Sequence, residues 1–238
     1  MKHADRTAVI AAFSLILFAT GAMLPLAAAD KAAFAKYWTA AGKSYPAGKQ
    51  FVMAAAWAPG QYVITGTTTK GKQDSVCKQT IVRKEDGGWV FENWTIDSKG
   101  KEAVSQMLLK GFDEAVKAGD ASKISIGWMK MKNEDGTVQK IEGDQMVIFN
   151  AFFKSTYEKL VVNISVFTDG GAVTVPAGTF AGTNYQKSSI KIMGMKIATE
   201  NWFNSAVPVN GMVKTQTSDG KSVTELLSFG FDGKGTLD

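Results

Sequence analysis

Residues 74–97 read DSVCKQTIVRKEDGGWVFENWTID, and this stretch predicts the fold of the chain. Two runs rich in Val, Ile, Thr and aromatic residues, 74–84 and 88–97, flank the triplet Asp86-Gly87-Gly88. Asp-Gly between such runs is the strongest short-range signal for a β-hairpin, because glycine readily adopts the positive φ that tight primed turns need. The stretch therefore predicts two neighbouring antiparallel strands.

The same pattern of strands and turns repeats along the chain. Further strands are expected at 51–57, 61–69, 123–131, 137–142, 171–175, 179–193, 195–203, 211–217 and 222–231. Turn signals between them are Pro59-Gly60, Lys70-Gly71, Glu134-Asp135-Gly136, Asp169-Gly170-Gly171 and Asp219-Gly220. The Asp135 and Asp219 turns, like the Asp86 turn, are expected to join neighbouring antiparallel strands. This regular spacing of turn signals between strands indicates an antiparallel β protein.

Two internal stretches break this alternation. From Lys101 to Lys117, apolar residues recur at helical spacing with charged residues on the other side, which predicts an amphipathic helix. A second helix is expected over 144–161, with Asp144 as its N-cap. A shorter helix is expected over 31–41, near the start of the mature chain.

Strands that surround two internal helices, rather than alternating with them, indicate an α+β fold. We expect a large curved antiparallel sheet, an incomplete β-barrel, with the two internal helices packed on its concave face. One domain over residues 30–238 is the preferred division, and two domains separated near Gly170 are the alternative.

Residues 1–29 have the three parts of a secretory signal peptide. Lys2 and Arg6 precede an uncharged, apolar run, and Ala27 and Ala29 give the small-x-small pattern that signal peptidase accepts. We expect cleavage after Ala29 and export to the bacterial periplasm. The run is about 22 residues long, enough to cross a bilayer if it is not cleaved, so a retained anchor is the alternative.

Catalytic and metal-binding patterns are scarce in this sequence. The single histidine, His3, lies in the leader, so cleavage removes the side chain best suited to proton transfer near neutral pH. We expect no catalytic residue, no metal site and no cofactor. The lone Cys77 is expected to be a buried, unreactive side chain. An enzyme that works through paired carboxylates, or through Ser with Lys, is a third and weaker interpretation.

Charge is spread along the chain rather than clustered. Lysine and arginine number 27 against 22 aspartate and glutamate residues, a formal net charge of +5, and Arg83 is the only arginine after residue 29. Nucleic-acid recognition favours arginine forks and clustered positive charge. We therefore expect no nucleic-acid partner, with weak contact to an anionic membrane surface as a lesser expectation.

Tryptophan, phenylalanine and methionine are more abundant than a thin sheet requires. In 88–96 the apolar side chains point to both faces, which indicates either two covered faces or an exposed apolar groove. Methionine is over-used at surfaces that accept varied apolar ligands, and a cavity between sheet and helices is a usual form of ligand site. The residues expected to line such a cavity are Met107, Leu108 and Phe112 on the first helix, Phe149, Phe153 and Tyr157 on the second, and Trp94 and Trp128 on the sheet. An ordinary core built from the same residues is the other interpretation.

The C-terminal block carries a family resemblance. It runs VTVPAGTF (173–180), NWFNSAVPVNGMVK (201–214) and ELLSFG (225–230). This order of turn motifs resembles a group of uncharacterised bacterial secreted proteins, which are similar in turn to the periplasmic LolA/LolB-like lipoprotein carriers. The resemblance implies an incomplete β-barrel lined by helices that holds acyl chains. It implies no site residue, because these motifs shape turns and carry no chemistry.

These observations predict a periplasmic, non-catalytic protein that binds an apolar or amphipathic ligand, a lipid or a lipidated partner, between sheet and helices. The alternative is an envelope protein–protein interaction module without a small-molecule ligand, whose edge strands or loops contact the partner.

Overall fold

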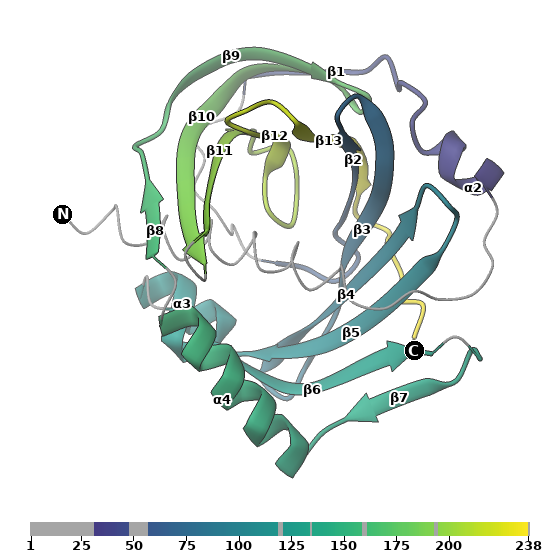
Figure 1. The fold of residues 1–238 in the computed structure, drawn as a ribbon, viewed down its shortest axis with the longest axis vertical. Coiled ribbons are helices and arrows are strands. Elements are labelled where there is room, and N and C mark those ends of the chain that lie inside the picture. The colour runs from purple at the N-terminus through teal and green to yellow at the C-terminus, as the bar shows by residue number, and fades with distance from the viewer. Residues whose placement is uncertain are drawn as a thin grey trace.

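A computed structural model of the chain describes residues 31–47, 57–118, 121–133, 135–158, 161–192 and 195–237. These residues form a strongly curved sheet with three α-helices and one short 3₁₀ helix (Figure 1). The expected signal peptide, residues 1–29, and most of the strand expected at 51–57 lie outside the described residues. Among the helices described, none combines the length and the hydropathy needed to cross a membrane.

Thirteen strands are described, and most lie where the sequence predicts them. In chain order they are β1 (Ser44–Tyr45), β2 (Tyr62–Thr69), β3 (Lys72–Glu85), β4 (Gly88–Asp97), β5 (Glu102–Lys110), β6 (Ser125–Lys132), β7 (Val138–Ile141), β8 (Val161–Ile164), β9 (Thr168–Val175), β10 (Gly178–Ile192), β11 (Met195–Phe203), β12 (Met212–Thr217) and β13 (Ser222–Gly230). The helices are α2 (Lys31–Lys36), α3 (Phe112–Ala118), η1 (Ala121–Lys123) and α4 (Asp144–Glu158).

All thirteen strands belong to one sheet. Its order is β1-β10-β11-β12-β13-β2-β3-β4-β5-β6-β7, and β8 and β9 also pair with β10. The described pairings are antiparallel except for β1 with β10, so the sheet is mixed. The path ends at β7 on one side and at β1 on the other, and the sheet is not closed into a barrel. The expected large, curved sheet is therefore confirmed, but the described sheet is mixed rather than wholly antiparallel.

The hairpin predicted from residues 74–97 is present. Asp86 and Gly87 both have positive φ, 47° and 72°, which is the backbone of a primed two-residue turn. The turn sets the register in which Lys84 faces Trp89, and an irregularity between Ile81 and Arg83 then shifts the pairing so that Ile81 faces Phe91. The Asp135 and Asp219 turns likewise join β6 to β7 and β12 to β13. Asp169-Gly170-Gly171 is different, because it lies inside β9, where Gly171 at φ 65° marks an irregular register with β10.

The helix predicted over 101–117 is wrong for most of its length. Residues 102–110 form strand β5, and α3 covers only Phe112–Ala118. Gly111 separates the two at φ 72°, and a Cβ at this position would collide with the carbonyl oxygen of Lys123. Met107 and Leu108 therefore lie on a strand, not on a helix.

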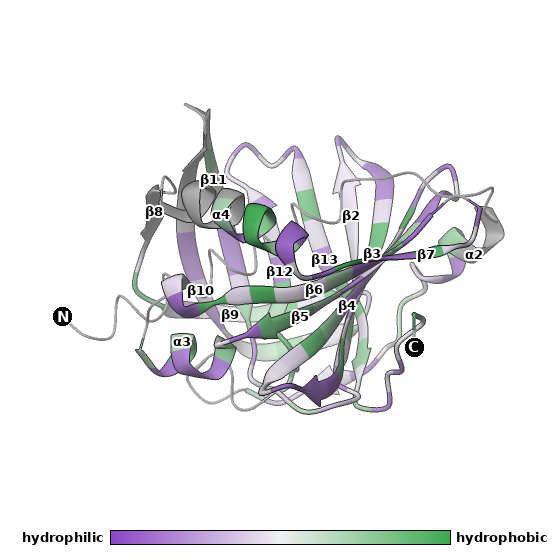
Figure 2. Cartoon of the chain, turned by 90° about the horizontal axis from the view of Figure 1, so that it is seen from below, coloured by the Kyte–Doolittle hydropathy of each residue, from purple (hydrophilic) through white to green (hydrophobic). Residues whose placement is uncertain are grey.

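The other helices are closer to expectation. α4 begins at Asp144, as predicted, and ends at Glu158, after which residues 161–164 form β8 rather than a last helical turn. α2 is the predicted N-terminal helix in a shorter form. Two helices closing the concave face are not confirmed, because one of them is mainly β5. In Figure 1, α3 and α4 overlap at one side of the sheet, but Figure 2 shows that the two helices lie apart.

Apolar side chains are buried on both faces of the sheet, in three clusters. The main cluster defines the inner face and joins residues of β2–β6 to β10, β12 and β13, with Phe112 and Ala115 from α3 and Met146 from α4. A second cluster includes Ile64, Val76 and Ile96 on the outer face, where Phe34 of α2 covers them. A third cluster, Val90, Leu108 and Trp128, lies farther along the same outer face. Alternation of hydrophilic and hydrophobic residues along the strands is visible in Figure 2.

Candidate functional site

The eight residues predicted to line a cavity do not converge on one site. Met107 and Phe112 belong to the main cluster on the inner face, and Phe149 packs against it. Leu108 and Trp128 belong to the third cluster, and Trp94 packs against the second, both on the outer face. The sheet lies between these two groups. Phe153 and Tyr157 lie in α4, but their side chains are outside the described part of the structure.

At the centre of the main cluster the inner face is packed rather than hollow. The ring of Trp57 stacks on that of Phe112 with 3.7 Å between centroids, and it also contacts Trp89 and Phe91. The Trp57 Nε1–H donates to the carbonyl oxygen of Val209 at 2.9 Å, so its polar atom is paired as well. These aromatic residues fill the space in which a ligand was expected. A site must be sought at the margin of the cluster.

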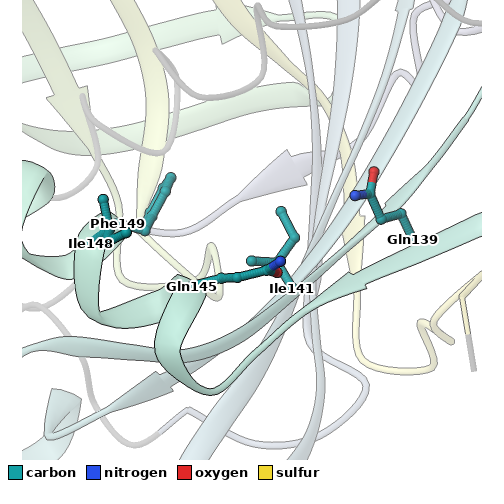
Figure 3. A pocket seen from close by; sticks show the side chains of 5 residues that line it. All are labelled: Gln139, Ile141, Gln145, Ile148 and Phe149. Carbon is teal, nitrogen blue, oxygen red and sulfur yellow. The ribbon is translucent and has the colours of Figure 1, made fainter.

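An open apolar groove lies at that margin, between β7 and the first half of α4. Its lining residues are Gln139 and Ile141 of β7 and Gln145, Ile148 and Phe149 of α4 (Figure 3). The groove is open to solvent and has a volume of about 520 Å³. Ile148 is 75% exposed, which is high for an isoleucine in a folded domain. Of the eight predicted residues, Phe149 alone is among those lining this groove.

A side-chain amide fixes the helix that forms one wall of the groove. Asn150 Oδ1 accepts a hydrogen bond from the backbone N–H of Ile126 at 2.9 Å, and its Nδ2 donates to the carbonyl of the same residue at 2.8 Å. Asn150 thus pairs with β6 as a neighbouring strand would. Met146, one turn earlier, is buried in the main cluster. Together they hold α4 beside β6 while Ile148 remains exposed.

The β7 wall is held by its pairing with β6. Met129 faces Ile141 and Met131 faces Gln139 in this register, so the two groove-lining residues of β7 point to the inner face. The intervening Lys140 points to the outer face and faces Lys130. Because side chains alternate along a strand, this short edge strand presents Gln139 and Ile141 on one face and the positive charge of Lys140 on the other.

The outer face beside this edge carries a cluster of positive charge around an indole. The ammonium groups of Lys130 and Lys140 lie 5.4 and 5.8 Å from the centroid of the Trp128 ring, close enough for cation–π attraction. Trp128 Nε1–H donates to Glu85 at 2.9 Å. Burial acts to raise the pKa of Glu85, but the hydrogen bonds from Trp128 and Arg83 outweigh it and lower that pKa. Glu142 pairs with Lys140.

The described residues show no arrangement for metal binding. They contain no group of three or more His, Cys, Asp or Glu side chains placed to hold an ion. Cys77 is half-buried, its thiol donates to Asn93 Oδ1 at 3.0 Å, and burial raises its pKa to about 12. A thiol with that pKa is protonated near neutral pH and is a poor nucleophile. The expectation of an unreactive Cys77 agrees with this environment.

Sequence reasoning missed most of the groove. Ile148 was apparent only as a widening of the apolar face of the second helix, and Ile141, Gln139 and Gln145 carried no signal. The useful sign is the run Val147-Ile148-Phe149, since three consecutive apolar residues cover more of the helix circumference than one core-facing stripe.

Comparison with known proteins leaves the family open. No family model and no curated protein matches the chain. Among solved structures, one similar chain is a "putative exported protein with YmcC-like fold" from Bacteroides fragilis, with 13% identity and a TM-score of 0.36, covering 73% of this chain and 96% of that one. A likeness at this level identifies neither the fold nor the function of the chain. The resemblance to lipoprotein carriers stays a prediction.

Proposed function

We propose that the chain is an exported, non-catalytic envelope protein that binds the apolar part of a lipid or lipidated partner in the groove between β7 and α4. The exposure of Ile148 beside Ile141 and Phe149 is the observation that supports this proposal most strongly. Water contact with such a surface is unfavourable by about 25 cal/mol per Å² of apolar area, so an apolar occupant stabilises it.

The expected binding is reversible. Burial of an acyl chain contributes about 0.8 kcal/mol per methylene, so ten methylenes give about 8 kcal/mol. Association costs about 4–15 kcal/mol in lost freedom of motion. The two terms are of similar size, so a single acyl chain in an open groove binds weakly and exchanges readily. Such behaviour suits a protein that picks up and releases its ligand without chemistry.

The site differs from the one expected at first. The proposed ligand lies at the edge of the sheet, because Trp57 and its aromatic neighbours occupy the interior. Phe149 belongs to both versions of the site, and Phe153 and Tyr157 follow it at intervals of one helical turn.

A titration with a 16-carbon fluorescent fatty acid tests the proposal. Ile148→Asp places a charge in the groove and should weaken binding at least tenfold. Val147→Asp is the matched control, since Val147 is 67% exposed on the same helix but is not among the residues lining the groove. Binding that both variants weaken equally, or that neither changes, would contradict the proposal.

A second candidate function rests on β7 itself. β7 is the last strand on its side of the described sheet, and an edge of this kind is able to pair with an extended segment of a partner protein. Here the chain is an envelope interaction module without a small-molecule ligand. Lys140→Pro removes a backbone N–H at this edge without changing a groove-lining residue. It should therefore impair partner binding while leaving fatty-acid binding unchanged.

Neither candidate includes a bond-making step or a cofactor. The proposed partners are a lipid or a lipidated protein, with weak attraction of the lysine-rich surface to anionic membranes. A nucleic-acid partner is not proposed, because the positive charge is carried almost entirely by dispersed lysines.

A further inference from the structure

An extended segment that follows β13 crosses the outer face of the sheet. We call residues 233–237 the strap. Gly233 lies against β3, where a Cβ would come within 3.1 Å of Thr80 Cγ2. Farther along, Thr236 reaches Glu92 on β4, and the carbonyl of Leu237 accepts a hydrogen bond from Lys130 on β6 at 3.2 Å. Figure 1 shows this yellow end of the chain passing to the side of β6.

Glu92 is the main anchor of the strap. Its side chain is buried, with 2% of the residue exposed. One carboxylate oxygen accepts from Gln106 Nε2 at 2.7 Å and from the backbone N–H groups of Thr236 and Leu237 at 2.7 and 3.2 Å. The other oxygen accepts from the Thr236 hydroxyl at 3.0 Å. Three of these four donors come from the strap, and a buried carboxylate without donors is strongly disfavoured.

The strap lies along a polar row that runs across four strands. Glu92 faces Gln106, Gln106 faces Lys130, and Lys130 faces Lys140 in the cross-strand register. One end of the row accepts N–H groups and the other end donates to carbonyl oxygens. A polypeptide that lies along the row is therefore held in one direction. The buried cluster of Val90, Leu108 and Trp128 borders the row and forms an apolar flank.

The strap is held differently from the strands. It pairs with no strand in the described sheet, and after Gly233 its described hydrogen bonds go to two side chains, those of Glu92 and Lys130. Lys234 and Thr236 are exposed, while Leu237 is buried. Loss of one carboxylate would release most of these bonds together.

We propose that this polar row is a binding site for an extended peptide in which a hydroxyl residue is followed by an apolar one, and that the strap is its displaceable internal occupant. The external ligand presents the same three donors to Glu92 and the same carbonyl to Lys130. This site is on the opposite face of the sheet from the groove between β7 and α4. The peptide proposal does not depend on the proposed lipid function.

The test uses the full chain and a labelled peptide, Gly-Lys-Gly-Thr-Leu-Asp. Thr236→Pro removes an N–H and a hydroxyl from the strap but leaves Glu92 and Lys130 in place. The peptide should bind the T236P chain at least tenfold more tightly than the unaltered chain, in which the strap competes. A control peptide with Pro in place of Thr should bind at least tenfold more weakly. Trypsin should cleave after Lys234 at least tenfold faster in T236P.

Two further variants locate the peptide. In the T236P chain, Glu92→Gln should weaken peptide binding at least tenfold. If that change unfolds the protein, Lys130→Ala keeps the buried carboxylate and should weaken binding at least threefold. The proposal is overturned if T236P fails to bind the peptide, if both peptides bind alike, if trypsin cleaves T236P no faster, or if the anchor variants that fold do not change affinity.

Discussion

At the scale of single residues, position on the sheet decides what each side chain does. Leu108 and Leu109 are both buried, yet one belongs to the outer cluster and the other to the main inner cluster. Glu92, between Val90 and Trp94 on the outer face, is buried and accepts four hydrogen bonds. The role of a residue therefore depends on the face of the sheet on which its side chain lies, and residue type alone does not reveal that face.

Asn150 offers a residue-scale test of how the groove wall is held. Asn150→Ala should lower the free energy of unfolding by about 1–3 kcal/mol. The partly buried backbone N–H and C=O of Ile126 both lose the side-chain amide that they bond to. Urea denaturation followed by tryptophan fluorescence measures this. Gln145→Ala on the same helix is the control, and an equal effect of both changes would show that the amide pair does not hold α4.

Cys77 gives a prediction about pH. Because burial raises its pKa to about 12, the thiol remains protonated at pH 8 and should react with iodoacetamide at least tenfold more slowly in the folded protein than in urea. The effect of pH on stability has a definite direction. The thiol of the unfolded chain ionises at a lower pH than the folded one, so the folded state loses stability as the pH rises toward 12. Rapid alkylation of the folded protein at pH 8 would contradict this environment.

At the scale of elements, strands bounded by clear turn residues were predictable from the sequence, and β5 was not. β4 and β11 match their expected bounds, 88–97 and 195–203. Each of these β-rich runs is bounded by residues that interrupt the strand pattern. In β5 both faces are covered, with Met107 and Leu109 inside and Leu108 outside. Apolar residues on both faces remove the period of two, so the run resembles a helix. Gly111 was the missed signal, since its positive φ ends the strand before α3.

The turn between β3 and β4 carries an element-scale prediction. Gly87→Ala should cost about 1–2 kcal/mol of stability, because φ is 72° there and an added Cβ would contact nothing within 4 Å. The cost is thus conformational rather than steric, and equilibrium urea unfolding measures it. Asp86→Asn should be nearly neutral, since asparagine tolerates the same conformation. A neutral Gly87→Ala would contradict the positive φ at this position.

At the scale of the whole molecule, the curved sheet followed from the sequence but the site did not. Asp-Gly turns and β-rich runs are local signals, and they predict an antiparallel sheet without tertiary information. Whether the sheet encloses a hollow depends on how Trp57, Phe91 and Phe112 meet from distant segments. No local pattern encodes that meeting. The groove arises for the same reason, because β7 and α4 are placed by the inner cluster and by Asn150.

The most direct test of the lipid proposal is native mass spectrometry of the purified protein with a molar excess of the 16-carbon fatty acid, because a ligand that exchanges readily would be lost during purification. We predict a bound lipid on the unaltered chain and on Val147→Asp, and its loss from Ile148→Asp. Lipid-free protein in all three samples, or equal lipid on both variants, would contradict binding in the groove between β7 and α4.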